Sequence, residues 1–333
     1  MRDWFTHGAE AEKAGLEPGW HYLDVHEFAE TSPDPHARIE MSLTKSQSRA
    51  IAFDSLADIV DDVIAETEFE GAADPTQAIN KRGRRIVSVI SGKGGVGKTS
   101  VALGLAGAAA TRGLRVVAVD LDPQGSLTLT TLGPAPQRSV EAAFEQSSIA
   151  AEICASTWTF ARGAIDVVPA QRSLALRDQP VSALHAHSIL AQRLGDLSTY
   201  DLVVIDAPST LSALAFEAVA LAHDVLVVTE PTRFGLTSAA DAVEFARLAR
   251  SGGKNWIRRV HVLLNKHDGS DESTYRLREL RRNFSEERLE TVLGINEEIN
   301  YANGAGAVVQ QIPGATAHKA STAFASLLDE LGL

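Results

Sequence analysis

Seven short apolar runs rich in Val and Ile recur along the last three quarters of the chain, and they constrain the fold more than any other feature. Most of these runs lack an alternation of apolar and polar residues, as expected of strands buried on both faces. Segments of helical length separate them, so the pattern predicts an α/β fold with a mostly parallel sheet covered by helices on both faces. Ligands bind such sheets at the carboxyl ends of the strands. We expect strands at residues 86–90, 116–121, 165–168, 202–205, 225–228, 260–264 and 308–312. We expect helices at residues 98–112, 184–197, 210–222, 236–251 and 315–332.

A glycine-rich segment follows the first expected strand directly. It reads Ser91-Gly-Lys-Gly-Gly-Val-Gly-Lys-Thr-Ser100, and its glycines, Lys98 and Thr99 have the Walker A spacing. Glycines let the backbone wrap closely around phosphate oxygens, and the helix that begins near Lys98 adds its positive end. Lys98 reaches the β- and γ-phosphates in such a loop, and the Thr99 hydroxyl ligates Mg²⁺. We therefore assign nucleotide contacts to Gly92, Gly94, Gly95, Val96, Gly97, Lys98, Thr99 and Ser100.

A second lysine stands near the start of this loop. Lys93 gives the string Lys93-Gly-Gly-Val-Gly-Lys-Thr99, which resembles the deviant Walker A motif of the ParA/MinD family of P-loop ATPases. The resemblance implies that Lys93 reaches across a dimer interface to the nucleotide of the partner subunit. A cation delivered in this way neutralises phosphate charge in the transition state, so Lys93 is a catalytic candidate beside Lys98. The alternative is a solvated lysine near the phosphates of its own subunit.

Two acidic strings extend the resemblance. Val119-Asp-Leu-Asp-Pro-Gln-Gly-Ser126 is similar to the Asp-x-Asp-Pro-Gln-Gly motif of the ParA branch, which implies that Asp122 orients the attacking water and that Asp120 lies near the Mg²⁺ shell. Leu202-Val-Val-Ile-Asp-Ala-Pro208 resembles a Walker B strand, which implies that Asp206 holds Mg²⁺ through water. Taken alone, an aspartate that closes an apolar strand is also an ordinary strand-end cap.

The string Val262-Leu-Leu-Asn-Lys-His-Asp268 lies where the family places base contacts, and the resemblance implies that Asn265 hydrogen-bonds adenine. The same string resembles the Asn-Lys-x-Asp guanine reader of GTPases, so it does not by itself distinguish ATP from GTP. ATP follows from the family resemblance, which covers about residues 85–332. At its end, residues 307–313 and the helix after them are similar to the last strand and helix of the family.

The first 80 residues differ in composition from the rest. They hold 17 Asp and Glu against 5 Lys and Arg, whereas residues 81–333 hold 26 of each, so the formal charge of −12 belongs to the first quarter of the chain. Residues 48–66 have the spacing of one amphipathic acidic helix. We expect an acidic N-terminal region at residues 1–80 and an ATPase domain at residues 81–333. The region is a docking site for a partner, an autoinhibitory arm lying on basic clusters, or a structural appendage.

Two arginine-rich clusters offer a surface for DNA. They comprise Arg247, Arg250, Lys254, Arg258 and Arg259, and Arg276, Arg278, Arg281 and Arg282. Arg278 and Arg282 share one face of an expected helix. Each contact of a basic side chain with phosphate adds affinity through counterion release. The alternative is that these arginines pair with interleaved glutamates on a solvated face.

The sequence thus predicts a ParA-type switch ATPase that hydrolyses ATP slowly with Mg²⁺ and dimerises when ATP is bound. Plasmid or chromosome partition, nonspecific DNA binding and a ParB-like or other protein activator follow from the resemblance, whereas the cargo stays open. The alternative is a MinD-like, cargo-positioning or regulatory ATPase that acts through protein partners without DNA. A reductase of this fold needs a pair of cluster-ligating cysteines, and the chain has only Cys154.

Membrane association is not expected. No apolar run approaches the ~20 residues that span a bilayer. The C-terminal segment at residues 321–333 carries Asp329 and Glu330 and no basic residue. The single cysteine fits a cytoplasmic protein, associated with the nucleoid if it binds DNA.

Overall fold

The computed structural model describes residues 84–134, 136–145, 148–178, 190, 197–251 and 257–333. The predicted acidic region, its amphipathic helix at residues 48–66 and most of the helix expected at residues 184–197 lie outside these residues, as does Lys254. The expected domain boundary at residue 80 therefore stays a prediction.

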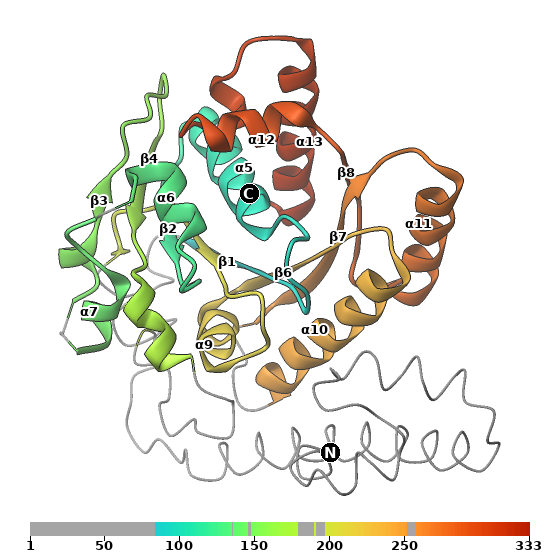
Figure 1. The fold of residues 1–333 in the computed structure, drawn as a ribbon, viewed down its shortest axis with the longest axis horizontal. Coiled ribbons are helices and arrows are strands. Elements are labelled where there is room, and N and C mark those ends of the chain that lie inside the picture. Colours follow the sequence, from blue (N-terminus) through green and yellow to red (C-terminus); the bar gives the residue numbers. More distant parts are fainter. Residues whose placement is uncertain (1–83, 135, 146–147, 179–189, 191–196, 252–256) are drawn as a thin grey trace, which may run out of the picture. The chain divides into compact units, whose positions relative to one another are not determined.

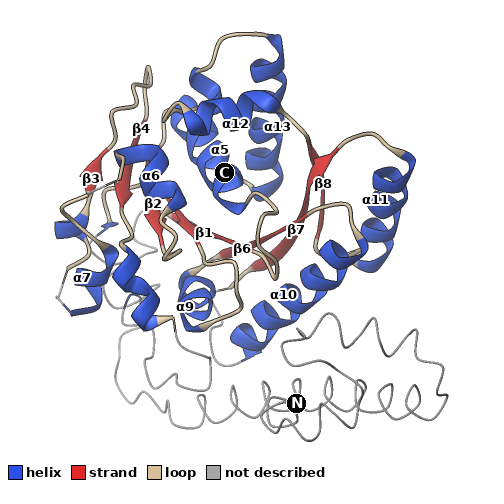
Figure 2. Ribbon diagram, viewed as in Figure 1, coloured by secondary structure: helices blue, strands red, loops and turns tan. Residues whose placement is uncertain are grey.

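Within the described residues, eight strands form one sheet in the order β3-β4-β2-β5-β1-β6-β7-β8 (Figures 1 and 2). Every neighbouring pair is parallel except β3 and β4. Six of the seven expected strands are confirmed, and all side chains of β5 and β6 are buried, as their uninterrupted apolar character predicts. The strands are β1 (Arg85–Ile90), β2 (Arg115–Asp120), β3 (Cys154–Ala155), β4 (Ala164–Val168), β5 (Leu202–Asp206), β6 (Asp224–Thr229), β7 (Arg259–His267) and β8 (Arg288–Gly294).

Helices cover both faces of the sheet, with α5 and α13 on one face and α9 and α10 on the other (Figures 1 and 2). The helices expected at residues 98–112, 210–222, 236–251 and 315–332 are confirmed with small shifts of their ends. None of the described helices is long and apolar enough to cross a membrane. The α-helices are α5 (Lys98–Thr111), α6 (Ser126–Leu132), α7 (Val140–Glu145), α9 (Ala213–Leu221), α10 (Arg233–Ser251), α11 (Asp271–Asn283), α12 (Glu297–Gly304) and α13 (Ala315–Leu331). The 3-10 helices are η2 (Ala150–Glu152), η3 (Arg172–Arg177) and η6 (Val309–Gln311).

The strand expected at residues 308–312 is wrong, because this segment forms η6. Its apolar side chains are buried against α5 rather than in the sheet: a Cβ placed on Gly107 would lie 3.1 Å from Val308 Cγ2. Gln310 Nε2 also donates a hydrogen bond to the Gly104 carbonyl at 2.9 Å. The place beside β7 belongs to β8, which the apolar pattern did not reveal.

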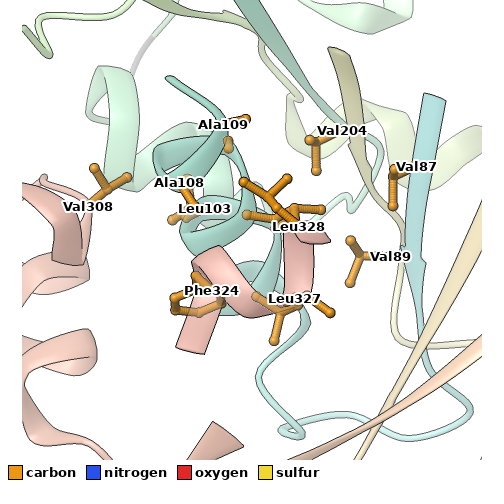
Figure 3. Close-up of a cluster of buried hydrophobic side chains, with 14 of the residues drawn as sticks. Val87, Val89, Leu103, Ala108, Ala109, Val204, Val308, Phe324, Leu327 and Leu328 are labelled. Carbon is orange, nitrogen blue, oxygen red and sulfur yellow. The ribbon is translucent and has the colours of Figure 1, made fainter. Parts of the chain in front are cut away.

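Close packing against α13 fixes the position of α5 (Figure 3). The middle of α5 consists of small residues, and Gly104 lies so near the ring of Phe324 that a Cβ there would come within 2.2 Å of it. Phe324, Leu327 and Leu328 are fully buried in this cluster (Figure 3). Because α5 begins at Lys98, the same packing holds the amino end of this helix in place over the sheet.

The strand order reverses at β1. The chain places β2, β4 and β5 on one side of β1 and then β6, β7 and β8 on the other. In parallel α/β sheets, the crevice at the carboxyl end of such a reversal point is the usual ligand site. The glycine-rich loop begins at this point.

Candidate nucleotide site

The loop between β1 and α5 has the backbone conformation that only glycine adopts readily. Gly95 and Gly97 have φ angles of 78° and 93°, in the left-handed region. Gly92 is required for a different reason, because a Cβ at this position would lie 2.4 Å from the Ser238 carbonyl oxygen on α10. A loop of this kind at the amino end of a helix is an anion site, since its N–H groups converge and the helix dipole favours negative charge.

A cavity of about 600 Å³ opens beside the loop, a size typical of small-ligand sites. Gly95, Gly97, Lys98, Thr99 and Asp122 line one part of the cavity. Lys98 is only 7% exposed, although its side chain carries a charge. The cavity thus brings together Gly95, Gly97, Lys98, Thr99 and Ser100 of the predicted nucleotide contacts, whereas Gly92, Gly94 and Val96 do not line it.

Thr99 and Asp206 form the polar pair that fits Mg²⁺. The Thr99 hydroxyl donates to Asp206 Oδ2 at 2.7 Å, and the buried Asp206 Oδ1 has no hydrogen-bond partner within the described residues. Burial, and then the negative charge of Asp120, raises the pKa of Asp206 to about 8. An unfilled carboxylate oxygen beside a threonine hydroxyl suits a hydrated Mg²⁺, which keeps several water ligands and takes others from phosphate. No group of three His, Cys, Asp or Glu suited to a metal occurs in the described part of the chain.

The two carboxylates after β2 have different surroundings. Asp120 is fully buried, and both its oxygens are occupied: Oδ1 accepts from the Asp122 N–H at 3.1 Å, and Oδ2 accepts from the N–H and hydroxyl of Thr128 at 2.9 and 2.7 Å. Burial outweighs these bonds and raises the pKa of Asp120 to about 6. Asp122 lines the cavity and is 9% exposed. The placement suits Asp122 for orienting water and gives Asp120 an anchoring contact to α6, while its place near Mg²⁺ stays a prediction.

Residues 84–255 match the AAA domain family. The chromosome-partitioning ATPase Soj of Thermus thermophilus is 30% identical over 240 residues, which cover 71% of this chain and 92% of Soj. The chain belongs to the ParA/MinD family of P-loop ATPases. It is an ATPase that uses ATP and Mg²⁺.

Solved structures share the fold. A variant of Cyanothece McdA in complex with ATP has a TM-score of 0.64 at 18% identity and covers 75% of this chain and 97% of its own, which establishes the common fold. Cobyrinic acid a,c-diamide synthase from Mycobacterium smegmatis, with bound ADP and magnesium, has a TM-score of 0.53 at 25% identity. The match covers 60% of this chain and 82% of the synthase.

The lysine that marks the ParA/MinD family is held by a carboxylate of its own chain. Lys93 is not among the residues that line the cavity. Its ammonium group instead forms an ion pair with Glu230, the residue after β6. Its predicted role in a partner subunit therefore stays a prediction that this placement allows.

Asn265 contacts the loop in this ParA/MinD ATPase. Asn265 Nδ2 donates to the Val96 carbonyl at 2.8 Å, and a Cβ on Gly97 would lie 2.4 Å from the same nitrogen. Asn265 also lines the cavity, so its contact with adenine stays a prediction. Asp268 Oδ1 accepts from the N–H and hydroxyl of Ser270 at 2.9 and 2.7 Å, and Asp268 does not line the cavity. The geometry therefore gives no support to guanine reading by this string.

The wall of the cavity farther from β1 escaped the sequence reasoning. It is formed by Leu293, Gly294, Ile295 and Asn296, where β8 leads into α12, with Ile299 and Asn300. Ile295 is 62% exposed, which suits an apolar contact with a base. Asn303 on α12 donates to the Ser100 hydroxyl at 2.9 Å and so ties this wall to α5. The sequence Gly294-Ile295-Asn296 marks the end of β8 and could have indicated this wall. It could be interpreted in this way only if β8 had been predicted.

The predicted DNA-binding arginines divide into two groups. The first group is paired within the chain. Arg247 contacts Glu287, and Arg259 lies 3.6 Å from Asp224. Arg276 contacts Glu272 and Glu279 at 2.7 and 2.8 Å, and Arg281 contacts Glu290 at 3.2 Å. Interleaved carboxylates thus neutralise part of the expected basic surface.

The second group is exposed and forms no ion pair with another described residue. It comprises Arg250, Arg258, Arg278 and Arg282. Arg278 and Arg282 lie on one face of α11 together with Tyr275, which is 53% exposed. This face of α11 is the strongest candidate for a phosphate contact.

Proposed function

We propose that this ATPase is an ATP-dependent dimerising switch of the ParA type, which acts in plasmid or chromosome partition and binds DNA nonspecifically. The observation that carries the proposal is the position of Lys93, in the phosphate loop but outside the cavity of its own subunit. A lysine there would meet the nucleotide of a second copy once its ion pair with Glu230 opens. The similarity to the partition ATPase Soj supports the biological setting.

The residues divide the work as follows. The loop, the amino end of α5 and Lys98 bind the triphosphate, and Thr99 and Asp206 would hold Mg²⁺, which neutralises phosphate charge when bound. Asp122 orients a water molecule for in-line attack on the γ-phosphorus. Lys93 of the second copy adds positive charge as the transition state forms. Hydrolysis removes the contact that bridges the two copies, so the dimer loosens.

The mass of the protein in solution tests the switch. We expect a monomer without nucleotide or with ADP, and a dimer with a non-hydrolysable triphosphate. Asp122→Ala should accumulate the dimer with ATP, because water is no longer oriented, whereas Lys98→Ala should stay monomeric. The same mass under all three nucleotide conditions would rule out the switch, and hydrolysis by Asp122→Ala at the parent rate would rule out the role of that residue.

DNA binding is assigned to the α11 face that carries Arg278 and Arg282. The double variant Arg278→Gln/Arg282→Gln should lower the slope of log affinity against log salt by about two per protomer, since each arginine that binds a phosphate releases roughly one counterion. Arg276→Gln/Arg281→Gln removes the same charge from the same helix but from arginines that are already paired, so its slope should change less. Equal slopes for the two variants would contradict this surface.

A second candidate is a cargo-positioning or regulatory ATPase that acts through protein partners without DNA. It is favoured by the intramolecular pairing of Arg247, Arg276 and Arg281. Binding to DNA that is absent, or that does not weaken with salt, would favour this candidate. Both candidate functions include a ParB-like or other protein activator, which docks on residues 1–80 or elsewhere.

A further inference from the structure

Glu230 carries a network of polar interactions around the phosphate loop that the proposed chemistry does not use. Its Oε1 forms an ion pair with Lys93 Nζ, and its Oε2 lies 3.9 Å from Lys266 Nζ. Lys266 Nζ also donates a hydrogen bond to the Gly95 carbonyl. One carboxylate therefore connects a lysine of the loop to a lysine of β7, and the second lysine returns to the loop.

The backbone of Lys266 indicates that this network is built rather than incidental. Lys266 is the one described residue other than glycine with a positive φ, 61°. An L side chain is crowded in this conformation, which persists only where surrounding contacts hold it. Lys266 keeps it at the end of β7, where its ammonium group contacts both Gly95 and Glu230.

We propose that Glu230 is a positioning residue that holds Lys93 on its own subunit until the nucleotide of a second copy competes for it. This inference rests on the proposed dimerising function. The side chains of Lys93 and Glu230 are 40% and 16% exposed, so their ion pair is of the modest strength typical of half-exposed pairs. A triphosphate carries more negative charge than one carboxylate and draws Lys93 away. ADP lacks the γ-phosphate, so Glu230 recaptures the lysine after hydrolysis.

The second lysine explains why the exchange is reversible. When Lys93 leaves, Glu230 still has Lys266 beside it, so the carboxylate is not left without a cation. The Lys266 bond to Gly95 meanwhile keeps the loop in place. Lys93 thus has two alternative anions, one in its own subunit and one across the interface, and nucleotide decides between them.

The first test measures Lys93 directly in nucleotide-free protein, without reference to activity or dimerisation. Brief acylation with an amine-reactive reagent, quantified by mass spectrometry, should label Lys93 about threefold to fivefold faster in Glu230→Gln than in the parent protein, the factor expected for loss of a half-exposed ion pair. Glu230→Asp should label at an intermediate rate, because the charge is kept on a shorter side chain. Lys319, exposed on α13, is the internal standard. Equal labelling of Lys93 in parent and Glu230→Gln would overturn the proposal.

The second test measures dimerisation with a non-hydrolysable triphosphate. Glu230→Gln should lower the protein concentration for half-dimerisation by about tenfold, because dimerisation no longer has to break one ion pair in each of the two copies. Glu145→Gln is the matched control, since it removes the same charge from a surface ion pair with Arg177, and neither residue lines the cavity. A higher concentration for Glu230→Gln would overturn the proposal. If no protein dimerises, the dimerising function fails while the labelling result still decides the role of Glu230.

Discussion

Two aspartates at opposite ends of the sheet are equally buried and are used in opposite ways. Asp206 closes β5 at the carboxyl end of the sheet, and Asp224 begins β6 at the amino end; neither is exposed. Asp224 is surrounded by basic side chains: Arg85 Nε lies at 3.1 Å, His261 Nε2 at 3.4 Å and Arg259 Nε at 3.6 Å. Asp206 accepts one bond from Thr99, and its other oxygen has no partner in the described structure.

The partners decide the protonation of each carboxyl group. Burial alone raises the pKa of Asp224, but hydrogen bonds from His261 and Arg85 and their positive charge hold it below its usual value. Burial, with the charge of Asp120, raises the pKa of Asp206 to about 8. One carboxylate is satisfied within the fold, and the other is left for a ligand. Burial by itself therefore does not distinguish these two aspartates, whereas the partners of their oxygens do.

The largest expected effect tests the structural member of the pair. Asp224→Ala leaves Arg85 and Arg259 at the amino end of the sheet without their carboxylate. The free energy of unfolding should therefore fall by about 3–5 kcal/mol. Urea unfolding followed by circular dichroism measures this loss. Glu145→Ala, which breaks the exposed pair with Arg177, should cost less than about 1 kcal/mol. A loss of similar size in both variants would remove the distinction between the two ends of the sheet.

Asp206→Asn tests the functional member. The amide keeps the shape of the side chain and removes a buried group whose ionisation is opposed by burial and by Asp120, so the free energy of unfolding should stay the same or rise. ATP hydrolysis should fall by about a hundredfold or more, since the charge that faces Mg²⁺ is lost. Unfolding curves and turnover measured on the same preparation compare the two properties. A stable variant that hydrolyses ATP within about tenfold of the parent rate would show that the unfilled oxygen has no catalytic use.

The amino end of the sheet also predicts how stability depends on pH. The Ile86 N–H donates to His223 Nδ1 at 3.0 Å, which requires a neutral ring. Burial, and then the charges of Arg258 and Arg85, lowers the pKa of His223 to about 4, against about 6.5 in an unfolded chain. The unfolded state thus binds the proton more readily between these values, so the stabilisation is complete above about pH 6.5 and is lost as the pH falls toward 4.

Unfolding free energies at pH 7 and pH 5 check this dependence. The parent should lose about 2 kcal/mol more over this interval than His223→Gln, which cannot titrate. His318→Gln, in which an exposed histidine on α13 is replaced, should follow the parent. Parallel losses in the parent and His223→Gln would mean that this histidine is not held neutral.

Much of the fold and of the site was predictable from the sequence because the residues concerned are adjacent in the chain. The loop, Lys98 and Thr99 are adjacent in the chain, and strands buried on both faces appear as plain Val and Ile runs. β8 was missed because it is an edge strand in which buried Leu289 and Leu293 are separated by charged and half-exposed residues. The strand prediction at residues 308–312 was wrong because their apolar side chains pack against α5 rather than within the sheet.

The contacts that lie far apart in sequence were out of reach of pattern reading. Glu230 meets Lys93 across 137 positions, and Asn265 meets Val96 across 169. Neither spacing has a periodicity, because the contacts depend on which strands are neighbours in the sheet. The pairing of Arg247 and Arg281 with glutamates is likewise settled by packing between elements, and the sequence left both alternatives open.

Asp268, which follows β7, is the third aspartate in this comparison, and it carries the smallest expected effect. Its hydrogen bonds with the side chains of Ser270 and Ser273 lower its pKa, and it does not line the cavity. These serines hold Asp268 within its own turn, outside the cavity, so it is not placed to contact a base. Asp268→Asn should therefore change the preference for ATP over GTP by less than about twofold, whereas loss of a true base reader changes such a preference by orders of magnitude.

Competition between the two nucleotides for the purified variant measures this ratio, and Asn265→Ala supplies the contrast. Removal of the Asn265 amide loosens the Val96 carbonyl of the loop, so both nucleotides should bind more weakly. A larger change in the preference for ATP over GTP in Asp268→Asn would mean that Asp268 leaves Ser270 when nucleotide enters. In that event, the contacts of a carboxylate in the nucleotide-free protein would not determine whether it takes part in nucleotide binding, and Asp206 would be one of at least two carboxylates that do.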